Sequence, residues 1–171
     1  MTESYRKGEY VRYSCNGVCL VDDIRMTSLS RKDSPKEFYI LKPVSNPSST
    51  IFVPTGSPAL VAKMARLPTR EELDQLILST KDEHLPWVDD RKVRLANFQA
   101  IIKACNLREL LCLISCIYQR KQALLRAGKK LGVSDETILQ RAEDLVEDQV
   151  AFVLQVKGDQ VKTYLRENLH P

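Results

Sequence analysis

Pro54-Thr55-Gly56-Ser57-Pro58 is the stretch at which the residue pattern of this 171-residue sequence changes. Proline lacks an N–H donor and glycine weakens regular structure, so such a stretch ends an element. Before it, short runs of β-branched and aromatic residues alternate with turn residues. After Leu67, apolar residues recur every three or four positions. Strands followed by helices predict an α+β chain with two domains, which we place at residues 1–66 and 67–171.

The residues before this boundary predict a small antiparallel β-barrel. Residues 8–13 alternate polar and apolar side chains, and Asn16-Gly17 is a turn signal before a second extended run at 18–24. Further short runs follow at 38–41 and 51–54. Since no crossover helix separates the strands, a parallel sheet is excluded, and short strands with tight turns are typical of a barrel. Residues 60–64 fit either a last strand or a helical turn.

The residues after the boundary predict an all-α bundle of about five helices. Thr69-Arg70-Glu71-Glu72 has the spacing of a capping box. Asp89 and Asp90 suit the positive end of a second helix. A third helix is expected from Leu107 to Ala127, ending at Gly128. We expect its inward face to carry Leu107, Leu110, Leu111, Ile114 and Leu125. The remaining helices are expected after a cap at Ser134-Asp135-Glu136 and from Gln160 to Asn168.

Charge is distributed unevenly along the helical part, although the net charge of the chain is only +4. Between Arg91 and Lys130 there are ten basic residues and one acid, Glu109. From Leu131 to Val150 acids dominate. A basic segment followed by an acidic one predicts a polarised surface that attracts an anionic partner such as nucleic acid. Two ordinary solvated helix faces are the alternative.

Catalytic and metal-binding patterns are absent from the sequence. The only histidines are His84 and His170, and there is no phosphate-binding glycine loop or nucleophile elbow. We therefore expect no enzymatic activity and no cofactor. Cys112 and Cys116 lie on an apolar helical stretch, where free cysteine behaves as a core residue. The pair Cys15 and Cys19 lacks the spacing and the further ligands typical of structural zinc, so we expect no metal site.

The expected location is the cytoplasm. Residues 110–118, the longest apolar run, are too few to cross a bilayer, and residues 1–6 lead into no apolar signal segment. Five cysteines without framework spacing suit a reducing compartment. We expect a monomer, because no heptad pattern is visible.

Trp87 is the only tryptophan and lies in His84-Leu85-Pro86-Trp87-Val88-Asp89-Asp90-Arg91-Lys92-Val93-Arg94. An indole at the start of a basic helix has two interpretations. It can fill a gap between the two domains, with its N–H bonded to a backbone group. It can also be an exposed wedge that is pushed against nucleic acid. Residue types alone leave both open.

Several motifs resemble those of CarD/CdnL-type bacterial transcription regulators. In the β part these are residues 8–13, Asn16-Gly17-Val18, 38–43 and 49–54. In the helical part they are Pro86-Trp87, Arg91, Phe98, Leu110, Lys129-Lys130-Leu131 and residues 142–145. The first module also occurs in transcription-repair coupling factors, but this chain has no ATPase or helicase segment. Asn16 and Cys19 depart from the family pattern.

The resemblance implies a non-enzymatic regulator whose Tudor/SH3-like N-terminal module binds the β subunit of RNA polymerase through an exposed strand. Strand addition is physically reasonable, because an edge strand offers unpaired N–H and C=O groups. The residues that match this surface, and are the expected polymerase contacts, are Arg25, Thr27, Ile51 and Phe52.

The resemblance further implies that the helical module binds promoter DNA, without sequence specificity, at the upstream edge of the melted region. Trp87 would then lodge in the minor groove and stabilise the open complex, with apolar support from Leu85. The expected phosphate contacts are Arg91, Lys92 and Arg94. Asp89 stands where some relatives carry a DNA-contacting arginine. The alternative is a protein-interaction adaptor without DNA binding, with Trp87 buried between the domains. An RNA-binding barrel would need paired surface aromatics, which this sequence lacks.

Overall fold

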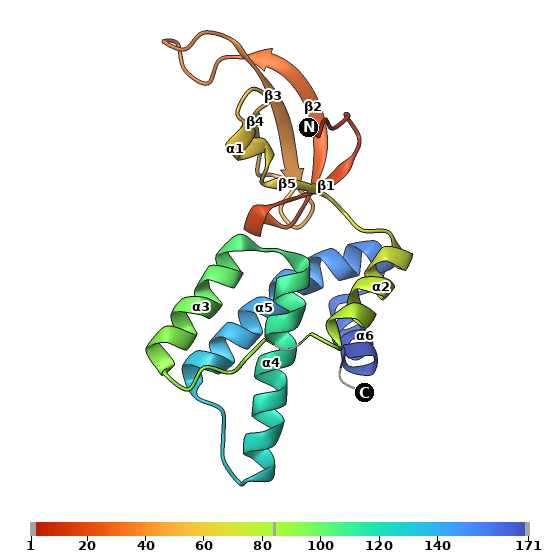
Figure 1. The fold of residues 1–171 in the computed structure, drawn as a ribbon. Coiled ribbons are helices and arrows are strands. Elements are labelled where there is room, and N and C mark those ends of the chain that lie inside the picture. Colours follow the sequence, from red (N-terminus) through yellow and green to blue (C-terminus); the bar gives the residue numbers. More distant parts are fainter. Residues whose placement is uncertain (1–2, 84, 170–171) are drawn as a thin grey trace. The chain divides into compact units, whose positions relative to one another are not determined.

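Two units make up the chain, Met1–Leu67 and Pro68–Pro171. The computed structural model describes residues 3–83 and 85–169, so both histidines, His84 and His170, lie outside the described residues. The first unit is a β-sheet with one short helix and the second contains five helices (Figure 1). The predicted α+β class with a β module followed by an all-α module is therefore confirmed.

The sheet unit contains five antiparallel strands in the order β4-β3-β2-β1-β5. Their bounds are β1 Tyr10–Tyr13, β2 Val18–Thr27, β3 Lys36–Pro43, β4 Ile51–Pro54 and β5 Met64–Arg66. The Asn16-Gly17 signal lies in the β1–β2 connection, where Gly17 has a φ of 75° that favours glycine. The long β2–β3 hairpin is drawn in orange in Figure 1.

The prediction of a closed barrel is wrong, because β4 and β5 remain the two edges of an open sheet. Residues 60–64, for which a strand and a helical turn were both open, contribute to each. Helix α1 spans Pro58–Val61, and β5 begins at Met64. Val61 of α1 and Met64 of β5 both enter the core. A helical turn thus covers core side chains between the last two strands, and β5 pairs with β1 alone.

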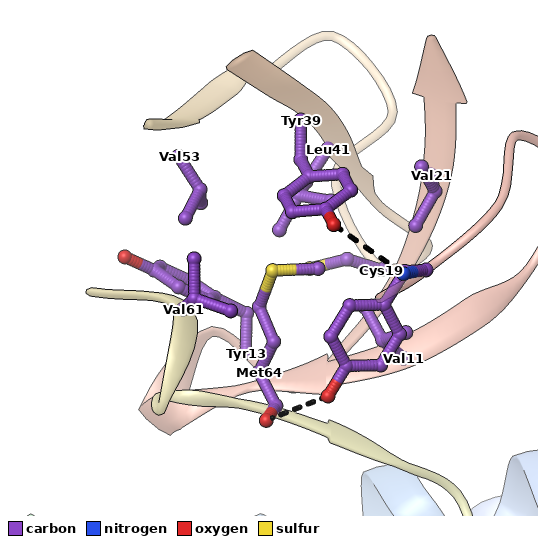
Figure 2. Close-up of a cluster of buried hydrophobic side chains, with 10 residues drawn as sticks. Val11, Tyr13, Cys19, Val21, Tyr39, Leu41, Val53, Val61 and Met64 are labelled. Carbon is purple, nitrogen blue, oxygen red and sulfur yellow. Dashed lines mark hydrogen bonds between the residues drawn. The ribbon is translucent and has the colours of Figure 1, made fainter. Parts of the chain in front are cut away.

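The core of the sheet unit is formed by side chains from every strand and from α1 (Figure 2). Tyr5 closes this core by donating hydrogen bonds from its hydroxyl and from its backbone N–H. Its hydroxyl donates to the Met64 carbonyl at 3.1 Å, and its N–H donates to the Tyr39 hydroxyl at 3.4 Å. Burial, with a smaller contribution from Glu3, raises the pKa of Tyr5 to about 12, so this phenol stays a hydrogen-bond donor at neutral pH.

A β-bulge in β2 decides which side chains reach the outer face of the sheet. Val21 pairs with Leu41 and Asp23 with Ile40, so Asp22 is an extra residue. Side chains in a strand alternate between faces, and one extra residue reverses that alternation. Val21 therefore belongs to the buried core, and Ile24, three residues later, is partly buried and packs against that core. Arg25 is thereby directed to the opposite face.

The helical unit contains the five predicted helices. Their bounds are α2 Arg70–Thr80, α3 Arg91–Ala104, α4 Leu107–Arg126, α5 Val133–Leu154 and α6 Gly158–Leu169. The predicted capping box is present at Thr69 and Glu72. Asp90 caps α3 by accepting from the Val93 N–H, and Gly128 has the left-handed φ expected past the end of α4.

Three details of the helix prediction are corrected. The N-cap of α5 is Gly132, and Ser134 and Asp135 lie inside its first turn. The last helix begins at Gly158. Leu125 is 50% exposed at the end of α4, where the inward stripe has already ended. Residues 110–117 of α4 are buried, including Cys112 and Cys116 as predicted. None of the helices in the described part of the chain combines the length and apolar content of a membrane span.

We predict that Thr69→Ala lowers the free energy of unfolding of the helical unit by about 1 kcal/mol. The change removes the acceptor of the Glu72 N–H, which would then have no partner inside α2. Urea denaturation measures the effect. Gln75→Ala, at an exposed position of the same helix, is the matched control and should shift the free energy by less than about 0.5 kcal/mol. Equal effects of the two substitutions would contradict this role of the cap.

Candidate functional site

Arg94 organises the segment that carries Trp87. It lies in the first turns of α3 and is only 7% exposed. Its Nε and Nη2 atoms donate to the two carboxylate oxygens of Asp135 in α5, each at 3.0 Å. Its Nη1 atom donates to the carbonyls of Val88 at 2.9 Å and Asp89 at 3.2 Å. One guanidinium thus joins two helices to the backbone that follows Trp87, in the planar fork geometry specific to arginine.

The Trp87 ring is held mainly by cations and is partly exposed. The guanidinium carbon of Arg94 lies over the ring, 4.3 Å from its centroid, and that of Arg120 lies 5.3 Å from it. Both distances are within the range of cation–π attraction. Phe98 packs edge-on at a centroid distance of 6.1 Å. The indole is therefore fixed in place without being sealed in an apolar core.

An open hollow of about 500 Å³ lies beside this ring. Its lining combines apolar groups and cations from the Trp87 segment and from α3, α4 and α5. The lining includes Trp87, Arg91, Arg120, Leu124, Val133 and Ser134, together with the acids Asp89 and Asp135. Val133 is 82% exposed, which is unusual for an apolar side chain and adds a hydrophobic contact point to the lining.

The predicted DNA-binding residues divide into two groups. Trp87 and Leu85 are partly exposed, and Arg91 and Lys92 are exposed at the start of α3. Arg91 donates to the neutral Ser134 hydroxyl at 2.7 Å. Arg94 is different, because its guanidinium is buried and occupied by Asp135 and two carbonyls. A side chain with these bonds is not placed to reach a phosphate.

The structure adds Arg120, a residue that the sequence analysis did not single out. Arg120 is exposed in α4, thirty-three positions from Trp87, yet its guanidinium lies near the indole. Within residues 3–83 and 85–169, the side chains of Arg91, Lys92 and Arg120 make no ion pair. The only sequence signal was the basic span from Arg91 to Lys130, which does not say which of its ten cations meet Trp87.

Three of the four expected polymerase contacts share one face of the sheet. Arg25 pairs with Phe38, which pairs with Pro54, and paired residues point to the same side. Thr27 and Phe52, each two positions from a member of this row, lie on that side as well. Ile51 is the exception, because it pairs with Leu41 and packs against the core cluster. Phe52 is 37% exposed and meets the Phe38 ring edge-on at 6.0 Å.

The outer edge of β4 offers few free backbone groups. Thr55 N–H donates to the Glu37 carbonyl, and hydrogen-bonded pairs alternate along an antiparallel ladder. It follows that Phe52 directs its N–H and C=O away from β3. Pro54 has no N–H, and its carbonyl accepts from Ser57. A strand added to this edge would therefore pair mainly with Phe52 and the residue two positions before it.

The described residues give no support for a metal site or for a reactive cysteine. They contain no group of three or more His, Cys, Asp or Glu side chains arranged to hold a metal ion. Burial, with help from the nearby Glu83 carboxylate, raises the pKa of the Cys112 thiol to about 11. Burial also raises the pKa of Cys116. Both thiols therefore stay protonated at neutral pH and are poor nucleophiles.

We predict that Asp135→Ala lowers the free energy of unfolding by about 3–5 kcal/mol, because it leaves the Arg94 charge buried without a counter-ion. Glu136→Ala is the matched control in the next position of α5. It removes the partly exposed pair with Lys121 and should cost less than about 1 kcal/mol. Chemical denaturation compares the two, and similar losses would show that Arg94 does not depend on Asp135.

Comparison with known protein families agrees with the geometry of the sheet unit. Residues 5–65 match the family described as the CarD-like/TRCF RID domain. The match covers β1 to β4, ends inside β5 and stops before the helical unit. No curated protein matches the chain. The family indicates an interaction domain with RNA polymerase as its partner and a role in transcription. Residues 5–65 of this chain are therefore similar to the CarD-like/TRCF RID domain, and the helical unit lies outside that similarity.

Proposed function

We propose that this protein binds the β subunit of RNA polymerase with its sheet unit and stabilises the open promoter complex with its helical unit. Trp87 acts as a wedge at the upstream edge of the melted DNA. The observation that carries the proposal is the setting of Trp87, a partly exposed indole beside a hollow with unpaired cations.

The cations supply affinity that does not depend on base sequence. Arg91 of α3 and Arg120 of α4 are exposed and line the hollow beside Trp87, and Lys92 is the exposed residue after Arg91. Arginine and lysine that neutralise phosphates release counter-ions from DNA, so binding weakens as salt rises. Phosphate contacts of this kind fix the orientation of a protein on the duplex without reading bases. Arg120 takes the phosphate role that was expected of Arg94. Asp89 also lines the hollow, and its charge opposes a phosphate there.

The wedge acts on an equilibrium that is already close to balance. Apolar and aromatic side chains inserted in the minor groove offset an unstacking cost of a few kcal/mol per base step. At a fork the neighbouring step is already open, so the cost is smaller. If Trp87 and Leu85 favour the open over the closed complex by about 1.4 kcal/mol, the ratio of the two rises tenfold.

The polymerase contact uses the outer face and the free edge of β4. Phe52 contributes both an exposed ring and an outward backbone N–H and C=O, whereas Arg25 and Thr27 extend the same face. Backbone pairing gives such a contact affinity, and the side chains on one face give it specificity. Ile51 supports the edge from the core side.

Trp87→Ala should shorten the lifetime of the open complex about tenfold while leaving binding to polymerase unchanged. The reason is that the substitution removes the wedge but touches no residue of the sheet unit. Lifetimes are measured by challenge of preformed complexes with a DNA competitor on several promoters. Arg141→Ala, which removes an exposed cation of α5 outside the hollow, is the control. Unchanged lifetimes with Trp87→Ala would favour an adaptor that does not bind DNA.

Phe52→Ala combined with Arg25→Ala should weaken binding to the polymerase β subunit at least about tenfold, since interface energy concentrates in a few buried side chains. Both side chains are exposed, so the sheet should remain folded, as circular dichroism can verify. Met26→Ala is the control, because Met26 is 62% exposed but lies on the other face of β2. Full binding by a folded double variant would exclude this surface.

A further inference from the structure

We propose that Arg94 and Asp135 are positioning residues that hold the Trp87 ring ready for DNA, an inference that rests on the proposed function. Neither residue contacts DNA itself. Their task is to fix the direction of the indole before binding, so that the ring does not have to be ordered when DNA arrives.

The segment around Trp87 has little else to hold its backbone. Residues 85–90 lie between α2 and α3 and contain no helix or strand. Backbone carbonyls in such a segment have no ladder partners of their own, and they need a donor or water. Arg94 supplies donors to two of them in succession, Val88 and Asp89. These two carbonyls follow directly on Trp87, so their anchoring limits how far the indole can move.

The same guanidinium also contacts the ring. Its carbon lies 4.3 Å from the centroid of Trp87, closer than that of Arg120. Asp135 in turn fixes the plane of the guanidinium, because two parallel bonds to one carboxylate leave it little freedom to rotate. The chain of contacts therefore runs from α5 through Asp135 and Arg94 to both the backbone and the ring of Trp87.

A purely stabilising role explains this arrangement less well. Replacing a buried ion pair by apolar residues of similar volume is often neutral or stabilising, because both charges lose their hydration on burial. Hydrophobic side chains at positions 94 and 135 could thus join α3 to α5. They could not donate to the Val88 and Asp89 carbonyls. Positioning and stability are therefore separable by substitution.

The test compares three new variants, together with Trp87→Ala, with the wild type. Arg94→Met/Asp135→Leu removes the pair without leaving a lone buried charge, and Arg94→Lys keeps the charge but loses the fork. Lys121→Ala/Glu136→Ala removes a neighbouring surface pair and is the matched control. Because Trp87 is the only tryptophan, its anisotropy decay reports ring motion directly. Binding to a forked DNA duplex and thermal unfolding are measured on the same samples.

We expect the Met/Leu variant to unfold at or near the wild-type temperature, to show a faster local anisotropy decay of Trp87, and to bind forked DNA about tenfold more weakly. The Lys variant should show the same faster decay, and the surface control should show neither change. A decay that stays as slow as in the wild type, in either folded variant, would overturn the positioning role. A faster decay without any loss of forked-DNA binding would also overturn it.

Failure of the proposed function has a different signature. In that case Trp87→Ala itself leaves the binding of forked DNA unchanged, whatever the ring mobility of the other variants. If Trp87→Ala weakens the binding of forked DNA but the Arg94 variants do not, only the positioning role is rejected and the proposed function stands.

Discussion

The fork of hydrogen bonds between Arg94 and Asp135 is the contact on which the geometry of the helical unit depends. Both side chains are more than nine-tenths buried, so water does not screen or replace their interaction. Burying two charges is costly, and the attraction between them offsets the cost only when the remaining donors are satisfied. Here the remaining donor, Nη1, finds two carbonyls of the segment after Trp87. The need to satisfy one buried guanidinium thereby sets the path of the chain into α3 and the place of its indole.

A comparable constraint acts in the sheet unit, where one extra residue assigns side chains to faces. If β2 continued through Asp22 in regular alternation, without a bulge, the pattern that puts Val21 in the core would also direct Arg25 and Thr27 inward. The bulge directs Ile24 toward the core instead and puts Arg25 on the same face as Phe52 of β4. In both units, then, a local constraint decides which side chains are buried and which are exposed. In the helical unit it is the hydrogen bonding of Arg94, and in the sheet unit it is the bulge at Asp22.

The sequence predicts the helices and strands better than it predicts whether the sheet closes into a barrel. Periodicity placed the helices, and the spacing from Thr69 to Glu72 identified a capping box, because these signals depend on neighbours in the chain. Whether β4 pairs with β5 depends instead on contacts between residues far apart in the chain, which local patterns do not report. The same limit applies to the site. Trp87 stands out as the single tryptophan, whereas Arg94 looks like any cation of a basic helix until Asp135, forty-one positions away, is seen to face it. Arg120 was hidden for the same reason.

The free edge of β4 has a consequence for how the chain behaves at high concentration. Long unpaired edges let identical molecules pair edge to edge into continuous sheets, and native proteins block this with short strands and prolines. In β4 only four residues pair, and Pro54 closes the outer side after Phe52. A second copy would gain too few backbone bonds to offset the entropy of association. The sheet unit can therefore leave the backbone N–H and C=O of Phe52 exposed without inviting its own polymerisation into fibrils.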